Sequence, residues 1–188
     1  LYIEPDSRVV QIEPSKIPAP SQAEEDRIPE VDLATDPRVF ALLDRTCAPS
    51  CFSRNWKSIA EKKGLIFEEG VESALTNFSE AVHRVGGKIP ARRPVRISFE
   101  LQGTPYLVPL CLYADEHEKG DRPLRISLPA QAQLGLVKDL QHACFRFGKT
   151  DDAIPMYKVR GTSGYTREYA VCVYDPTWID RGKVDRDE

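Results

Sequence analysis

The residues most able to do acid–base chemistry lie in one short charged stretch of the chain. His117 stands among four carboxylates, Asp115, Glu116, Glu118 and Asp121. Histidine titrates near neutral pH and carboxylate oxygens suit a hard cation, so this stretch has the groups for acid–base catalysis or cation binding. A solvated charged loop between two strands is the commoner origin of such a pattern. An enzyme of unfamiliar type, with a His/carboxylate loop, is therefore a third hypothesis for function.

Two pairs of soft metal ligands also occur, Cys47 with Cys51 and His142 with Cys144. Tetrahedral zinc needs four such groups on turns or on one helical face. The second pair falls within a predicted helix, where a separation of two residues points side chains about 200° apart. We therefore expect no metal and no other cofactor.

Nucleophilic catalysis has no local signature in the chain. The sequence lacks a G-x-S-x-G elbow, a phosphate-binding G-x-x-x-x-G-K loop, a G-x-G-x-x-G motif and an H-E-x-x-H motif. His83 and His142 are predicted on solvent-facing helix positions. We therefore assign no catalytic residue.

Basic side chains form two local clusters, the second of them interleaved with tyrosines. Arginine forks bind phosphates and unpaired bases stack on aromatic rings, so these clusters support an alternative function as a nucleic-acid-binding domain. The alternative explanation is that these basic residues lie on the solvent-exposed face of half-buried strands and form ion pairs with nearby carboxylates. The residues of the alternative site are Lys88, Arg92, Arg93, Arg96, Lys158, Arg160, Arg167 and Tyr165.

A strand predicted from Tyr106 to Tyr113 is apolar on both faces, so it is either covered on both sides or contacts another surface. Pro109 lacks an N–H for a ladder and favours an edge strand or a bulge. An apolar edge strand can accept an added strand from a partner. The candidate partner-binding residues are Tyr106, Val108, Leu110 and Leu112.

Composition bounds the function classes. The 188 residues are 41% hydrophobic and 29% charged with a net charge of −3, and no apolar run approaches the ~18 residues that span a bilayer. Five cysteines form no disulfide framework, which favours an intracellular (cytoplasmic or nuclear) protein. The first residue is Leu1 and no secretory signal follows, so we expect a piece of a longer protein.

The elements that would position these groups fall into two halves. Residues 1–34 are rich in proline and predict an extended arm, in which residues 8–12 could add one short strand to a sheet edge. Apolar residues at helical spacing then predict three amphipathic helices. These helices are expected at 37–46, after Ser53 as far as Gly64, and at about 68–84.

Beyond Pro90 the period of the apolar residues changes from 3.6 to 2. Alternation over 95–102 is the clearest strand signal, with one face buried and one wet. Further strands are predicted at 106–113, around 124–128, and as a hairpin of 156–160 with 165–174. A helix is predicted from Pro129 to about Phe147.

These elements predict an α+β fold, in which an N-terminal three-helix segment packs on a mainly antiparallel sheet of about five strands with one long helix inserted, in the order βββαββ. The predicted organisation is an arm (1–34), a helical subdomain (35–87), an antiparallel α+β domain (88–180) and a charged tail (181–188). The leading hypothesis is a non-catalytic adaptor or regulatory domain. Its expected partner is another protein or another domain of the same protein.

Overall fold

The computed structural model describes residues 26–46, 49–69, 91–103, 106–148 and 152–178. This part of the chain forms twelve β-strands, two α-helices and one 3₁₀ helix. The helices are α2 (Arg54–Lys63), α4 (Leu128–Leu134) and the 3₁₀ helix η2 (Gly164–Thr166). The strands are β1 (Glu30–Val31), β2 (Val39–Leu43), β3 (Cys51–Ser53), β4 (Ile66–Phe67), β5 (Ala91–Glu100), β6 (Leu107–His117), β7 (Arg125–Ile126), β8 (Val137–Asp139), β9 (Cys144–Arg146), β10 (Ala153–Pro155), β11 (Tyr157–Val159) and β12 (Tyr169–Tyr174).

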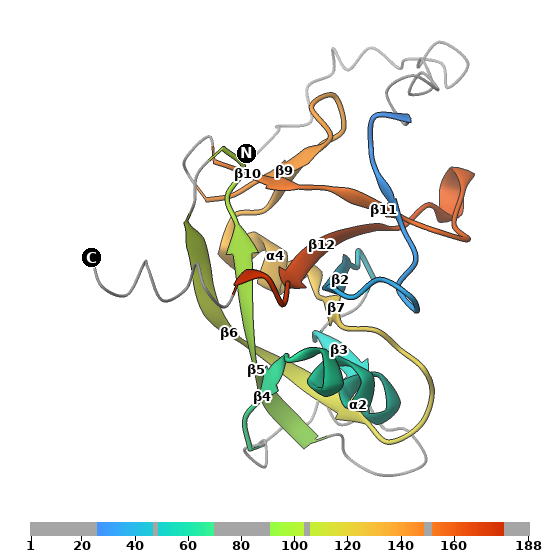
Figure 1. Cartoon of the computed structure of the whole chain (residues 1–188), viewed down its shortest axis with the longest axis vertical. Coiled ribbons are helices and arrows are strands. Elements are labelled where there is room, and N and C mark those ends of the chain that lie inside the picture. Colours follow the sequence, from blue (N-terminus) through green and yellow to red (C-terminus); the bar gives the residue numbers. More distant parts are fainter. Residues whose placement is uncertain (1–25, 47–48, 70–90, 104–105, 149–151, 179–188) are drawn as a thin grey trace, which may run out of the picture.

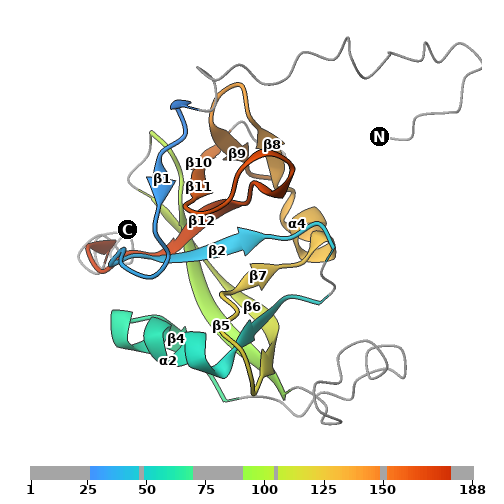
Figure 2. The same ribbon diagram turned by 90° about the vertical axis from the view of Figure 1, so that its right-hand side faces the viewer.

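Nine strands form one mixed sheet in the order β1-β11-β12-β2-β7-β3-β6-β5-β4, and β10-β9-β8 form a small second sheet. Three pairs in the large sheet are parallel, namely β1 with β11, β2 with β7 and β3 with β6. The sheet curls, so that β5 lies against β12 although the two are not neighbours in its order (Figure 1). The view turned by 90° shows α2 beside the β4 end of this sheet (Figure 2).

The strongest strand prediction is confirmed. Val95, Ile97 and Phe99 are buried while Arg96 is exposed, as the alternation requires. β5 pairs with β6 without a break from Ala91↔Glu116 to Glu100↔Leu107. The core face of this ribbon packs against β2 and β12, which supply further members of the same hydrophobic cluster.

Two more local predictions are confirmed. Ser53 caps α2 by accepting a hydrogen bond from the Trp56 N–H at 3.2 Å, and the helix ends at Gly64, whose φ of +118° is left-handed. β11 and β12 pair antiparallel, as the predicted hairpin requires.

The predicted α+β class is wrong, because the described chain is mainly β. Residues 39–43 form β2 rather than a helix, and they are buried almost throughout. An apolar run covered on both faces has no clear period, so helix and strand give the same pattern there. The third helix falls mostly on residues outside the described part, while Glu68 and Glu69 are not helical.

The long helix predicted from Pro129 to Phe147 is also wrong. α4 ends after one short stretch because Gly135 takes a left-handed φ of +68°. The chain then makes β8, a turn and β9, with Ala143 at a φ of +54° closing that turn. The apolar residues of this segment, which suggested a helix, instead belong to a short helix and to a small antiparallel sheet that packs on the core.

Residues 26–34, which the sequence assigns to the arm, contribute Ile28 and Val31 to the core of the domain. Among the described residues, no helix has the length and apolar character needed to cross a membrane.

Candidate functional site

The structure brings the first basic cluster and the acidic stretch together. β5 and β6 place Arg92 opposite Asp115, with Arg92 Nε 3.6 Å from Asp115 Oδ1. Arg93 Nε donates to Glu116 Oε2 at 2.7 Å. Both carboxylates are buried, so each arginine serves as the counter-charge of an acid inside the fold. Lys88 lies outside the described residues.

The first part of the acidic stretch is a strand end, whereas Glu118 and Asp121 lie in the exposed loop that follows. Asp115, Glu116 and His117 belong to β6 and pair in parallel with β3, and all three are buried. Arg54, the first residue of α2, also reaches Glu116 with an Nε to Oε1 distance of 3.4 Å. These charges therefore tie α2, β5 and β6 together.

The remaining acids of that stretch, Glu118 and Asp121, line a shallow hollow together with Arg54, Asn55 and Ser58. Asn55 donates a hydrogen bond to Asp121. His117 does not line this hollow. The hollow is therefore lined by two carboxylates without the histidine.

The second basic cluster lies on β11 and the turn before β12. Arg160 lies 3.7 Å from Asp32 and 4.0 Å from Glu30. Arg167 Nη1 donates to the Val159 carbonyl at 3.3 Å. Tyr165, in η2, is fully exposed. Arg92, Arg93, Arg96 and Arg160 thus each lie within 4.0 Å of a carboxylate of the fold.

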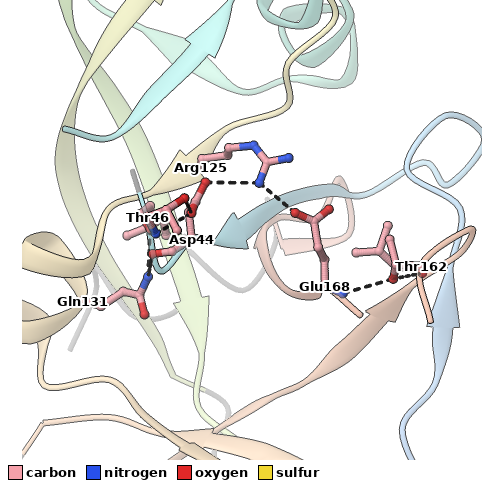
Figure 3. Close-up of polar contacts among 8 residues, drawn as sticks. Asp44, Thr46, Arg125, Gln131, Thr162 and Glu168 are labelled. Carbon is pink, nitrogen blue, oxygen red and sulfur yellow. Dashed lines mark hydrogen bonds and ion pairs between the residues drawn. The ribbon is translucent and has the colours of Figure 1, made fainter. Parts of the chain in front are cut away.

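A polar network that the sequence did not single out lies where β2 and β7 end (Figure 3). Asp44 Oδ1 accepts from Thr46 N at 2.8 Å and from Thr46 Oγ1 at 2.9 Å. Arg125 Nη1 donates to Asp44 Oδ2 at 3.2 Å and to Glu168 Oε1 at 2.8 Å. Gln131 Nε2 donates to the carbonyl oxygens of Asp44 and Ile126.

The network joins β7 and α4 to the residues just after β2 and just before β12. It leaves Asp44 poorly suited to act as a base, because both of its oxygens already accept hydrogen bonds. Burial alone would lower the pKa of Arg125, but the ion pairs with Glu168 and Asp44 outweigh it and raise that pKa. The sequence signal for this network is Asp44, a carboxylate directly after the apolar run of residues 39–43. That signal indicates a polar group at the end of a strand only when residues 39–43 are predicted as a strand.

Three of the four predicted partner-binding residues, Val108, Leu110 and Leu112, lie on β6 and alternate there with exposed residues. Val108, Leu110 and Leu112 pair with core residues of β5, and Leu112 is 6% exposed, whereas Tyr106 is 48% exposed. Whether these four residues bind a partner stays a prediction. The side chains that β6 presents to solvent in this stretch are Pro109, Cys111 and Tyr113.

These three residues and Ile66 form what we call the outer face. Ile66 of β4 pairs with Arg96, which pairs with Cys111, so the face continues across three strands. Tyr113 is 53% and Ile66 52% exposed. Arg96 lies within the face, between Ile66 and Cys111, and its Nε donates to Glu68 Oε1 at 2.6 Å. Large apolar side chains gathered on one surface are typical of a binding site.

The sequence predicted that His142 and Cys144 lie on one helix, which would point their side chains apart. That prediction is wrong, because His142 lies in a turn and Cys144 lies in β9. His142 Nδ1 instead lies 2.8 Å from Asp139 Oδ2. Cys51 and Cys144 are buried, and Cys47 lies outside the described residues. In the described ranges, no group of three or more His, Cys, Asp or Glu side chains is arranged to hold a metal ion.

Fold and site together define a mainly β domain with internally paired charges and one apolar outer face. No protein-family model and no curated protein matches the chain. A solved structure with some similarity is the retroviral protease-like domain of Ddi1 from Leishmania major, at 18% identity and a TM-score of 0.31, over 63% of this chain and 92% of that one. A score this low supports no inference about this chain.

Proposed function

We propose that this chain is a non-catalytic interaction domain of a larger intracellular protein, and that its outer face binds an apolar segment of another protein. The observation that carries the proposal is the row formed by Ile66, Cys111 and Tyr113, which exposes apolar side chains of β4 and β6 on the two sides of Arg96 in β5. Burying such a row against a partner removes apolar surface from water.

Two further features support the proposal. The carboxylates that could do chemistry, Asp44 and Glu116, are each engaged by an arginine and by other groups of the fold. Cys111, Cys144 and Cys172 are free thiols, which suits a reducing compartment.

Site-specific photo-crosslinking tests the proposal. A photoreactive phenylalanine analogue replaces Tyr113 in the full chain, expressed in the source cell. Tyr165, a tyrosine that is also exposed but lies in η2 away from the outer face, is replaced in the matched control. We expect one dominant crosslinked protein from position 113 and none of the same mass from position 165.

Substitution of the face provides the second arm of the test. Cys111→Asp places a charge in the exposed row and removes no core contact, so we expect it to abolish the crosslink from position 113 while the thermal unfolding midpoint stays nearly unchanged. Equal crosslinking from both positions, or crosslinking that survives Cys111→Asp, would contradict the proposal.

A further inference from the structure

A groove separate from the outer face runs along one side of α2. It encloses about 220 Å³, and α2 and β2 form two of its walls (Figure 2). Trp56, Ile59 and Lys63 of α2 line it on one side, at the spacing of one helical face. Val39 and Phe40 of β2 line it on the other side. The apolar stripe of α2 is therefore incompletely covered, and Ile59 is 47% exposed.

Both ends of α2 are fixed to the segments that border the groove. At the start of the helix, Ser53 Oγ accepts a hydrogen bond from the Arg122 N–H at 2.9 Å, and the neighbouring Asp121 lines the groove. At the end of the helix, Lys63 Nζ donates to the Asp36 carbonyl oxygen at 2.8 Å. Because these bonds set the positions of the walls, the groove is preformed, and an occupant does not have to open it.

The two ends of the groove carry opposite charges. Arg38 is neutralised by Asp36, with Nη2 2.9 Å from Oδ2, whereas Lys63 forms no ion pair with a described residue. One end therefore has an excess of positive charge. At the other end, Asp121 accepts a hydrogen bond from the neutral side chain of Asn55 and pairs with no cation among the described residues, which leaves an excess of negative charge.

The size of the groove limits what it can hold. A volume of about 220 Å³ is below the roughly 300 to 1,000 Å³ of sites that enclose a small molecule, and it suits a single large apolar side chain. From Asn55 to Lys63 the helix rises by roughly 12 Å, at ~1.5 Å per residue. An extended chain covers that span in about four residues, at roughly 3.3 Å each.

We propose that this groove binds an extended segment of a partner protein, with one large apolar side chain seated between an acidic residue at Lys63 and a basic residue at Asp121. Charge complementarity at both ends selects this occupant over a wholly apolar one. The inference goes beyond the proposed function, because no residue of the outer face lines the groove.

NMR titration of the full chain with defined peptides tests the proposal. The probes are the capped pentapeptide Glu-Thr-Leu-Thr-Lys and its reversed sequence, which covers the opposite chain direction. We expect at least one of them to shift the Trp56 indole N–H and the Ile59 amide saturably, with a dissociation constant below about 1 mM. Replacement of the central leucine of the peptide by serine should abolish these shifts.

Reversal of the charge at one end tests the specificity. Lys63→Glu makes both ends acidic, so the mixed-charge peptide should bind about 3- to 10-fold more weakly, while Lys-Thr-Leu-Thr-Lys should become the tighter ligand. A groove that was merely damaged would not gain affinity for the second peptide. Lys62→Glu is the matched control, because it makes the same change at an exposed neighbouring position that does not line the groove, and we expect it to leave both affinities nearly unchanged.

Absence of saturable shifts at Trp56 and Ile59 up to about 5 mM peptide would overturn the proposal. Equal binding of the serine peptide, or equal effects of Lys63→Glu and Lys62→Glu, would overturn it as well. Shifts of these signals on dilution of the peptide-free chain would assign the groove to a second copy. Peptide binding that requires Ile179→Asp would assign it to the residues after Trp178, and either assignment overturns binding of a partner segment. Failure of the proposed function would appear in the crosslinking from position 113 and not in these titrations.

Discussion

Individual side chains in this protein are held by partners from other elements. Arg93 and Glu116 are 23 residues apart in the chain and meet across β5 and β6. Arg38 is held by Asp36 and lies over the Phe40 and Tyr157 rings, 5.0 and 4.9 Å from their centroids. Charged residues that resemble binding groups in the sequence thus form ion pairs and hydrogen bonds within the fold.

Arg93 and Arg96 provide a matched comparison of two ion pairs. Arg93→Ala leaves buried Glu116 with Arg54 as its remaining arginine partner, so we expect a loss of about 1 to 3 kcal/mol in the free energy of unfolding. Arg96→Ala breaks an exposed pair with Glu68 and should cost under about 1 kcal/mol. Urea denaturation measures both, and equal losses would contradict the internal role of Arg93.

Asp36 predicts a dependence of stability on pH. The hydrogen bond from Arg38 lowers the pKa of the Asp36 carboxyl below its usual 3.8, although burial opposes the shift. Its contribution is therefore complete above about pH 4 and is lost as the pH falls through the lowered pKa. Asp36→Asn should cost about 1 to 2 kcal/mol at pH 7 and progressively less below pH 4. Chemical denaturation at a series of pH values measures the difference, and a cost that grows on acidification would refute this origin.

At the scale of the element, the pattern of β5 reflects its packing on the core, whereas the length of α2 reflects its own end residues. β5 has its clear alternation because one of its faces meets the core, including Phe99 against Phe147 with ring centroids 5.7 Å apart. α2 carries both a cap at Ser53 and a left-handed end at Gly64, so its length is set by its own residues.

The register of β5 predicts a large loss for one core substitution. Phe99 is fully buried, so Phe99→Ala leaves a cavity and should cost about 3 to 5 kcal/mol. Ser98, the neighbouring residue on the opposite face, is the control, and Ser98→Ala should cost under about 0.5 kcal/mol. Urea denaturation measures both losses in the free energy of unfolding. Similar losses for the two variants would contradict the assignment of Phe99 to the core face of β5.

The end of α2 predicts a difference between two glycines. A Cβ at Gly64 would lie 2.5 Å from Tyr174 Oη, and its φ of +118° is itself unfavourable for other residues. Gly64→Ala should therefore cost about 1 to 3 kcal/mol or more. Gly103 also has a positive φ, of +81°, but nothing lies within 4 Å of its added Cβ, so Gly103→Ala should cost about 1 kcal/mol. Thermal unfolding compares them, and a larger loss at Gly103 would refute the steric role of Tyr174.

At the scale of the whole molecule, the curled sheet decides which charges face solvent. It places Arg92 and Arg93 against the acids of β6 and leaves Arg96 and Arg160 as the more exposed arginines of the two basic clusters. The overall charge of −3 adds no long-range attraction for nucleic acids.

We therefore expect weak binding to nucleic acid, with dissociation constants above roughly 10 μM for labelled single and double strands at ~150 mM salt. Fluorescence anisotropy over a salt series measures this. If the exposed arginines did contact phosphates of a single strand, Arg96→Ala with Arg160→Ala would reduce the salt slope by about 1.4. Micromolar binding with that change in slope would favour the nucleic-acid alternative over the proposed protein interaction.

Sequence alone determined the elements whose signals are local. The Ser53 cap, the Gly64 stop, the alternation over 95–99 and the β11–β12 hairpin each depend on residues close together in the chain, which is why they were predicted correctly. Tertiary structure alone decided that residues 39–43 are a strand, since burial on both faces removes the periodicity that separates helix from strand. It also decided the pairing of Arg92 and Arg93 with Asp115 and Glu116, and the joining of Asp44 to Arg125 and Glu168. Those contacts join residues distant in sequence, and their geometry depends on the order and curl of the sheet, which a pattern of residue types does not encode.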